Sequence, residues 1–94
     1  MGILFEWDAT KAQQNIKKHG VTFDEASSAF SDPLSRTIID PLHSVNEHRF
    51  VLIGRSCKDR LLVVVHAEKG DKLRIISARE ASKRERMNYE ENEE

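Results

Sequence analysis

Three apolar runs with short breaks between them constrain the fold of this chain more than any other feature. The runs are rich in Val, Ile and Leu and cover residues 50–53, 61–67 and 73–78. β-branched side chains suit a pleated, half-buried surface. The breaks at 55–60 and 68–72 are too short for a crossover helix, so the runs predict antiparallel strands in a meander. Gly70 can supply the positive φ of a tight turn in the second break.

Helix signals precede the meander. Residues 9–19 carry a sparse apolar stripe, with Ala12 and Ile16 at helical spacing. Asp8 is placed to cap the first turn, and Gly20 is placed as the left-handed residue that follows the last turn. A helix is therefore expected at 9–19.

Capping boxes predict two more helices, because a Ser or Thr and a Glu three residues later can satisfy each other's backbone amides. Thr22 with Glu25 begins one of these helices, and Ser82 with Glu85 begins the other. Short strands are expected at 3–7 and 34–40. The resulting order, β-α-α-β-β-β-β-α, predicts an α+β fold with helices packed on one face of an antiparallel sheet.

Length and charge indicate a single domain over 1–94, with 90–94 as a frayed acidic tail. Residues 1–79 hold 12 Lys/Arg and 10 Asp/Glu, a net charge of +2, and residues 80–94 hold 3 and 6, a net charge of −3. A mildly basic body of this kind can attract a polyanion, although it lacks the strongly basic character of a dedicated nucleic-acid binder.

Composition also excludes several classes of protein. A single Cys57 rules out an internal disulfide and an all-Cys zinc site, and it fits a reducing compartment. No apolar run approaches the ~20 residues of a membrane span, and no secretory signal is visible, so we expect a cytoplasmic protein without a membrane partner. Glycine-rich phosphate loops, zinc-protease motifs and nucleophile elbows are absent.

A first group of candidate site residues lies in the loop before the meander. It comprises His43, Glu47, His48 and Arg49. Two imidazoles and a carboxylate so close together can do acid–base work or bind a metal in a small hydrolase. An ordinary solvated loop explains the same residues.

A second group interrupts the apolar strands. It comprises His66, Arg74 and Arg79, and strict alternation aligns His66 with Leu62 and Val64, Arg74 with Ile76, and Arg79 with Ile75 and Ser77. Guanidinium groups on a sheet are suited to binding phosphate and to stabilising the charge of phosphoryl transfer. Ion pairs with Glu6, Glu47 or Glu68 are the alternative explanation.

Three further residues have two possible roles each. Lys18 and His19 can bind RNA phosphate or can interact with the negative end of the helix dipole. Tyr89 can stack on a substrate base or can pack beneath the last helix. Cations and imidazoles without a metal-binding set fit metal-independent RNA cleavage, which needs a base, an acid and stabilisation of the phosphorane-like charge.

Several motifs, taken in order over about residues 4 to 91, resemble the BrnT toxin family. They are Phe5-Glu6-Trp7-Asp8, Lys11, Asn15, Lys18-His19-Gly20-Val21-x-Phe23-x-Glu25-Ala26, Phe30-x-Asp32-Pro33, Asp40 with His43-Ser44 and Glu47-x-Arg49, Ile53-Gly54-x-Ser56, and Arg74-Ile75-Ile76-Ser77-Ala78-Arg79-x-Ala81-x-x-x-Glu85-Arg86-x-x-Tyr89-Glu90. The resemblance implies a RelE-like fold and a small ribonuclease toxin of a type II toxin–antitoxin system, which arrests translation and growth by cutting RNA.

The same resemblance implies the partners of the chain. These are a BrnA-type antitoxin with a ribbon-helix-helix DNA-binding part, an RNA substrate, and operator DNA reached only through the antitoxin. We expect no cofactor and no metal. The expected catalytic residues are Arg49, His66, Arg74 and Arg79, and the expected RNA-binding residues are Lys18, His19, Glu47 and Tyr89. The alternative function is a non-catalytic co-repressor that binds a ribbon-helix-helix antitoxin.

Overall fold

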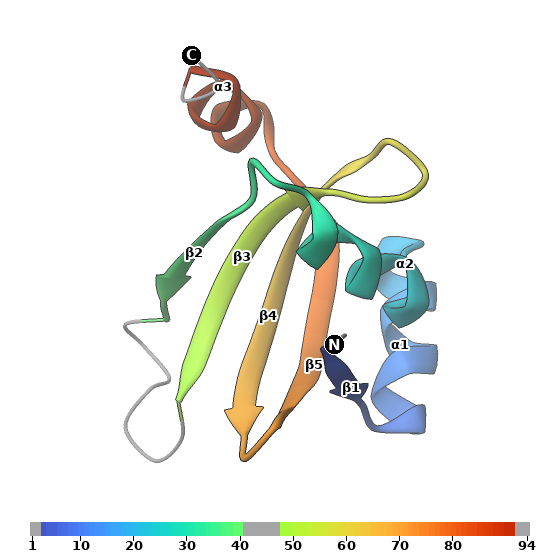
Figure 1. The fold of residues 1–94 in the computed structure, drawn as a ribbon. Helices are drawn as coiled ribbons and strands as arrows, with labels where there is room; N and C mark the ends of the chain where they lie inside the picture. The colour runs from blue at the N-terminus through green and yellow to red at the C-terminus, as the bar shows by residue number, and fades with distance from the viewer. Residues whose placement is uncertain (1–2, 41–47, 92–94) are drawn as a thin grey trace.

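A five-stranded sheet with the strand order β1-β5-β4-β3-β2 organises the molecule (Figure 1). The computed structural model describes residues 3–40 and 48–91. Its strands are β1 (Leu4–Glu6), β2 (Arg36–Ile39), β3 (Arg49–Arg55), β4 (Leu61–Lys69) and β5 (Lys72–Glu80). β3 to β5 form the expected antiparallel meander, and β2 extends it by pairing antiparallel with β3. β1 pairs in parallel with β5. The predicted α+β class and element order are confirmed.

Each α-helix begins directly after its predicted capping residue, and the first ends before Gly20 as expected. The helices are α1 (Ala9–His19), α2 (Phe23–Ser28) and α3 (Lys83–Glu91), with a short 3-10 helix η1 (Ala29–Ser31) after α2. Asp8 Oδ1 accepts the Lys11 amide at 2.9 Å, and Gly20 adopts a φ of 69°. No described helix is both long enough and apolar enough to span a membrane.

The two expected capping boxes behave differently. At α3, Ser82 Oγ accepts the Glu85 amide and Glu85 Oε1 accepts the Ser82 amide, so the reciprocal pair is complete. At α2, Thr22 Oγ1 accepts the Glu25 amide at 3.0 Å, but the Glu25 carboxylate does not return to Thr22. The reason is that a stronger partner, Arg60, takes that carboxylate.

An ion pair between a buried carboxylate and a half-buried guanidinium joins α2 to the turn between β3 and β4. The carboxylate of Glu25 accepts the Arg60 Nε–H at 2.8 Å, forms an ion pair with Arg60 Nη2, and accepts the Ser56 hydroxyl at 2.7 Å. The hydrogen bond from Arg60 lowers the pKa of Glu25 despite its burial. Removing one partner of such a pair leaves a buried charge uncompensated, which is strongly destabilising.

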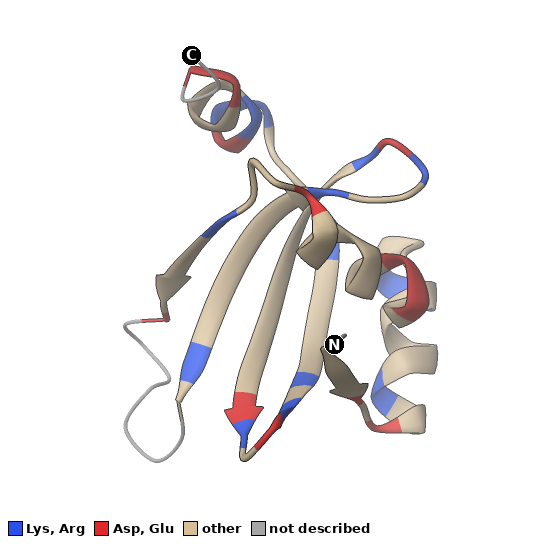
Figure 2. Ribbon diagram, in the orientation of Figure 1, with Lys and Arg blue, Asp and Glu red and all other residues tan. Residues whose placement is uncertain are grey.

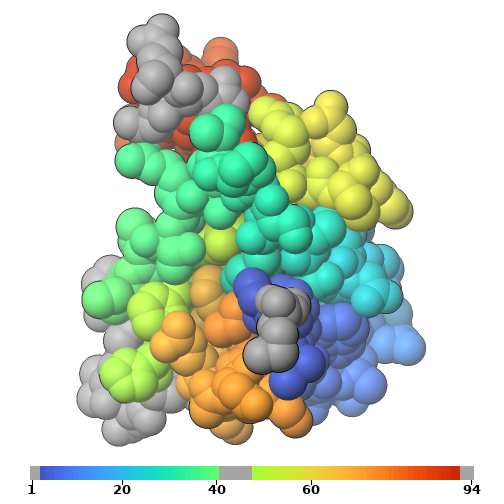
Figure 3. Space-filling view, viewed as in Figure 1, coloured from blue at the N-terminus to red at the C-terminus, as the bar shows by residue number. Residues whose placement is uncertain are grey.

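The hydrophobic core lies between α1, α2 and one face of the sheet. Its buried cluster consists of Val21, Phe23, Ala26, Leu62, Val64, Ile75 and Ala78. Asn15 on α1 is buried too, and its side-chain amide bonds both the Ala78 carbonyl and the Ala78 amide. The space-filling view shows α2 and η1 (teal) packed over the strands on this side (Figure 3).

The third helix lies apart from α1 and α2, at the end of the sheet where β5 finishes (Figure 1). Its residues Glu85 and Tyr89 line a cavity with Val51, Ile53 and Val63. These three side chains alternate with the buried residues of their strands, so they lie on the sheet face opposite the core. α3 therefore borders the sheet face that α1 and α2 leave uncovered.

Candidate functional site

One irregularity in the pairing of β4 and β5 determines which face the arginines of β5 occupy. Val65 pairs with Ser77, whereas His66, the next residue of β4, pairs with Ile75. Ile76 is therefore an extra residue in β5, and the register shift is a β-bulge. A bulge interrupts the alternation of side chains, so the residues before and after Ile76 do not follow one continuous pattern.

The bulge brings Arg74 and Arg79 onto the same face of the sheet. Ile75 and Ala78 are both buried in the core, although regular alternation places residues at an odd separation on opposite faces. Arg74 precedes Ile75 and Arg79 follows Ala78, so both arginines face away from the core. The expected alignment of Arg79 with Ile75 is wrong, because alternation within the sequence contains no signal for the extra residue.

The strand register shows which residues of the neighbouring strands lie beside Arg74 and Arg79 on this face. Arg49 pairs with Ala67, and Ala67 pairs with Arg74, so the two arginines lie in one row at the same level. A second row, nearer to α3, runs through Arg36, Ile53, Val63 and Arg79. Adjacent strands are about 4.8 Å apart, so the backbones of Arg49 and Arg74 are separated by roughly 10 Å. We call the surface framed by Arg36, Arg49, Arg74 and Arg79 the arginine face.

The centre of the arginine face is apolar. A row of Ile38, Val51, Val65 and Ser77 lies between the two rows that carry arginines. Basic residues occur near the ends of the central strands, and the middle of those strands carries no charge (Figure 2). A polyanion on this surface would therefore meet cations around an apolar floor.

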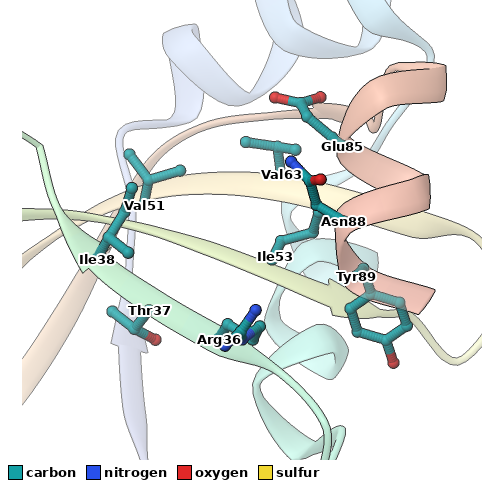
Figure 4. A pocket seen from close by; sticks show the side chains of 9 residues that line it. All are labelled: Arg36, Thr37, Ile38, Val51, Ile53, Val63, Glu85, Asn88 and Tyr89. Atoms are coloured by element: carbon teal, nitrogen blue, oxygen red, sulfur yellow. The ribbon is translucent and has the colours of Figure 1, made fainter. Parts of the chain in front are cut away.

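A cavity of about 450 Å³ opens on this floor, between β2 and α3 (Figure 4). We call it the α3 cleft, and its lining residues are Arg36, Thr37, Ile38, Val51, Ile53, Val63, Glu85, Asn88 and Tyr89. This volume falls within the ~300–1,000 Å³ that is usual for small-molecule sites. The α3 cleft is therefore a concave feature of the arginine face that is large enough to hold a small ligand.

Arg79 is fixed at one end of the α3 cleft by a carboxylate of α3. Its Nη1 and Nη2 donate to Glu85 Oε1 and Oε2 at 2.8 and 2.9 Å. The hydrogen bond from Arg79 lowers the pKa of Glu85 to about 2, and the same pairing raises the pKa of Arg79. Glu85 is consequently ionised at neutral pH and is unsuited to act as a general acid.

Tyr89 is buried and fastens α3 to the segment before β2. It is 2% exposed, and its hydroxyl donates to Asp32 Oδ2 at 2.6 Å. Burial, followed by the hydrogen bond to Asp32, raises the pKa of Tyr89 to about 12. The Arg55 guanidinium lies 5.7 Å from the centre of the ring. Of the two roles considered for Tyr89, this position matches packing beneath the last helix.

His66 lies on the opposite side of the sheet from the arginine face. It is 4% exposed and contacts two aromatic rings, with centroid distances of 4.8 Å to Phe30 and 5.8 Å to Phe50. Desolvation lowers the pKa of His66, so the ring favours its neutral form. The structure does not bring His66 together with the arginines with which it was grouped.

Lys18 and His19 are also separated from the arginine face. Lys18 and His19 are in the last turn of α1, which covers the core side of the sheet. Glu47 and His43 lie outside the described residues. In the part of the chain that the structure describes, no group of three His, Cys, Asp or Glu side chains is arranged to hold a metal ion.

Two residues of this region were not identified from the sequence. Arg36 shares the alternation of Ile38 within the expected strand 34–40, so a signal for its face was present. Asn88 follows Glu85 by three residues and therefore lies on the same side of α3. Nothing in the sequence indicated that this side of α3 would face β2, because the two elements are far apart along the chain.

Comparisons with known proteins agree with the architecture. Residues 7–85 match the family model described as "Ribonuclease toxin, BrnT, of type II toxin-antitoxin system". The crystal structure of the Brucella abortus ribonuclease toxin BrnT is similar, with a TM-score of 0.64 and 27% identity. That match covers 87% of this chain and 100% of the Brucella chain. No curated protein matches this chain.

Proposed function

Because this chain belongs to the BrnT family of ribonuclease toxins of type II toxin–antitoxin systems, we propose that it cleaves RNA without a metal ion and so arrests translation and growth. The observation that supports this proposal is the arginine face. Its four guanidinium positions come from β2, β3 and β5, and they surround an apolar floor on the uncovered side of the sheet.

Guanidinium groups at these positions suit a ribose-phosphate chain. A guanidinium can donate two hydrogen bonds to one phosphate, and arginine keeps its charge at any physiological pH. Arg79 would have to exchange the Glu85 carboxylate for the phosphate to do so. Arg49 and Arg74 lie in one row, and Arg79 lies further along β5 on the same face. We propose that these three arginines bind the scissile phosphate and its neighbours, with Arg36 on the far side of the floor.

The reaction proposed is transesterification within the RNA. The ribose 2′-oxygen attacks the adjacent phosphorus and loses its proton, while the bond from phosphorus to the 5′-oxygen breaks and that oxygen gains a proton. The products are a 2′,3′-cyclic phosphate and a 5′-hydroxyl end. Negative charge builds up on the phosphoryl oxygens, and fixed cations beside them lower the barrier.

The antitoxin is the partner that the family implies. We propose a BrnA-type antitoxin with a ribbon-helix-helix part, through which the complex reaches operator DNA. Covering the arginine face would neutralise the toxin, because RNA and the antitoxin would then compete for the same cations.

Cleavage by the purified protein in the presence of a chelator tests this proposal. Wild type is expected to cut single-stranded RNA in EDTA and to arrest growth when expressed alone. The double variant Arg74→Ala with Arg79→Ala is expected to lose at least a hundredfold in cleavage rate, since one preorganised contact to the transition state contributes about 10²–10³. The matched control, Lys11→Ala with Lys17→Ala, removes the same charge from α1 and should cut normally.

Three results would contradict the proposal. Loss of cleavage when EDTA is added would indicate a metal-dependent hydrolase. Equal activity in the double arginine variant would remove the arginine face from the reaction. Intact RNA with folded wild type, combined with tighter operator binding by the complex, would instead support the non-catalytic co-repressor.

A further inference from the structure

The α3 cleft has features that phosphate binding alone does not require. Its floor is made of branched aliphatic side chains. Ile38 lies at its outer edge, on the edge strand β2, and this large apolar side chain is 64% exposed. Large apolar side chains left exposed next to a formed cavity mark a surface that is covered when a ligand binds.

Charge identifies the kind of ligand. Arg36 and Arg79 lie at opposite ends of one row, with Ile53 and Val63 between them. Their backbones are separated by three strand spacings, or roughly 14 Å. The one carboxylate among the described lining residues, Glu85, is neutralised by Arg79. An apolar floor between Arg36 and the Arg79–Glu85 ion pair fits a nucleotide whose base lies on the floor and whose flanking phosphate contacts Arg36.

A polar group is placed to distinguish one base from another. Figure 4 shows Asn88 extending from α3 beside Val63 and Ile53 on the cleft side of the helix. A side-chain amide carries a donor and an acceptor, and it can bond two positions on the edge of one base. Single bases in enzyme pockets are held by contact of their faces with aromatic or apolar side chains and are distinguished by hydrogen bonds to their edges.

We propose that the α3 cleft binds one base of the RNA substrate next to the scissile phosphate, and that Asn88 determines which base is preferred. The base lies against Ile38, Val51 and Ile53, and the Asn88 amide bonds its edge. The protein then cuts single-stranded RNA with a preference at one nucleotide position. This inference rests on the proposed RNA cleavage, but binding of a base can be measured without cleavage.

Two pairs of variants isolate the cleft. Asn88→Ala removes the amide, and Gln13→Ala on α1 is its control. Ile38→Trp fills the cleft, and Ile39→Trp is its control, since Ile39 is adjacent, equally exposed at 64%, and pairs with Phe50 on the other face. All four positions are exposed, so the variants should fold, which circular dichroism checks.

The binding experiment titrates the protein with the four nucleoside 3′-monophosphates and follows the Ile38 methyl and Asn88 amide signals by NMR. One nucleotide is expected to bind roughly tenfold or more tightly than the weakest, the scale of one bidentate contact to a base. In Asn88→Ala, followed by the Ile38 methyl signals, the four affinities should become equal. In Ile38→Trp, the nucleotides should no longer shift the Asn88 amide signals. The control variants should match wild type.

The cleavage experiment maps cut sites in a pool of random single-stranded RNA. A preference at one position in wild type that disappears in Asn88→Ala would support the proposal. Cleavage without any preference, or shifts confined to residues outside the cleft, would overturn it while leaving the proposed function intact. Nucleotide binding in the cleft without RNA cleavage would support the base site and contradict the proposed function. Shifts in the cleft caused by the antitoxin and by no nucleotide would also overturn it, because the cleft would then be a protein-docking surface.

Discussion

Single side chains fasten α3 at the edge of the arginine face. Tyr89 donates to Asp32, and Asp32 also accepts the amides of Leu34 and Arg55 at 2.9 and 2.7 Å. Burial alone would raise the pKa of Asp32, but these hydrogen bonds together hold it below its ordinary value. Asp32 therefore joins α3, β3 and the turn before β2 as a charged acceptor.

The hydroxyl of Tyr89 should consequently matter for stability. Tyr89→Phe keeps the ring but removes the donor, and we expect the free energy of unfolding to fall by about 1.5–3 kcal/mol, the range of hydrogen bonds to charged groups. Urea unfolding followed by circular dichroism measures this change. Unfolding at the wild-type urea concentration would show that Asp32 is satisfied without Tyr89.

Local features such as helix ends could be predicted from the sequence, whereas the sheet face on which each strand residue lies could not. Asp8, Gly20 and Ser82 each fix a helix end through short-range hydrogen bonds or backbone sterics, so their roles were predictable. The common face of Arg74 and Arg79 depends on the register between two strands. Register is set by packing across the whole sheet, and a one-residue slip changes it without any local signature.

At the scale of the elements, β3 packs closely against η1. A Cβ added at Gly54 would lie 2.7 Å from the Ala29 carbonyl oxygen and 3.0 Å from the Ser35 Cβ. Gly54 therefore serves the close approach of two backbones rather than the conformation of a turn. The distance leaves no room for a side chain unless η1 moves away from the sheet.

A methyl group at this position should separate the two elements. We expect Gly54→Ala to lower the free energy of unfolding by about 1–3 kcal/mol, the usual cost of overpacking. Thermal unfolding is the measurement, with Gly70→Ala as the comparison. Gly70 has open space around it and a φ of 63°, so its substitution tests backbone strain without a clash. A wild-type melting temperature for Gly54→Ala would show that η1 can move away from β3 without loss of stability.

At the scale of the whole molecule, three carboxyl groups with lowered pKa values connect separate elements. Glu25 ties α2 to the β3–β4 turn, Asp32 holds α3 against β3, and Glu85 joins α3 to β5. Each binds its proton less readily in the folded state than in the unfolded chain. The unfolded chain therefore takes up more protons as the pH falls, and folding becomes less favourable.

Stability should decline across a defined range of acid pH. The pKa of Glu85 falls from an ordinary 4.5 to about 2, so its contribution is complete above the first value and is lost as the pH falls towards the second. We expect the urea midpoint of wild type to drop over this range. In Glu85→Gln the drop should be smaller, because that position no longer titrates. An equal pH dependence in both proteins would exclude Glu85 as a source of the acid sensitivity.

The extra residue of β5 has a consequence for how the surface can be lost. The arginine face depends on the bulge as well as on its arginines. If β5 kept Ile76 but paired with β4 in one regular register, Arg74 and Arg79 would be five residues apart on opposite faces, and one guanidinium would turn towards the aliphatic interior. Deleting Ile76 would instead leave the two arginines four residues apart, and a regular pleat would keep both on one face. Strand register, counted in single residues, is thus itself a determinant of chemistry in this protein.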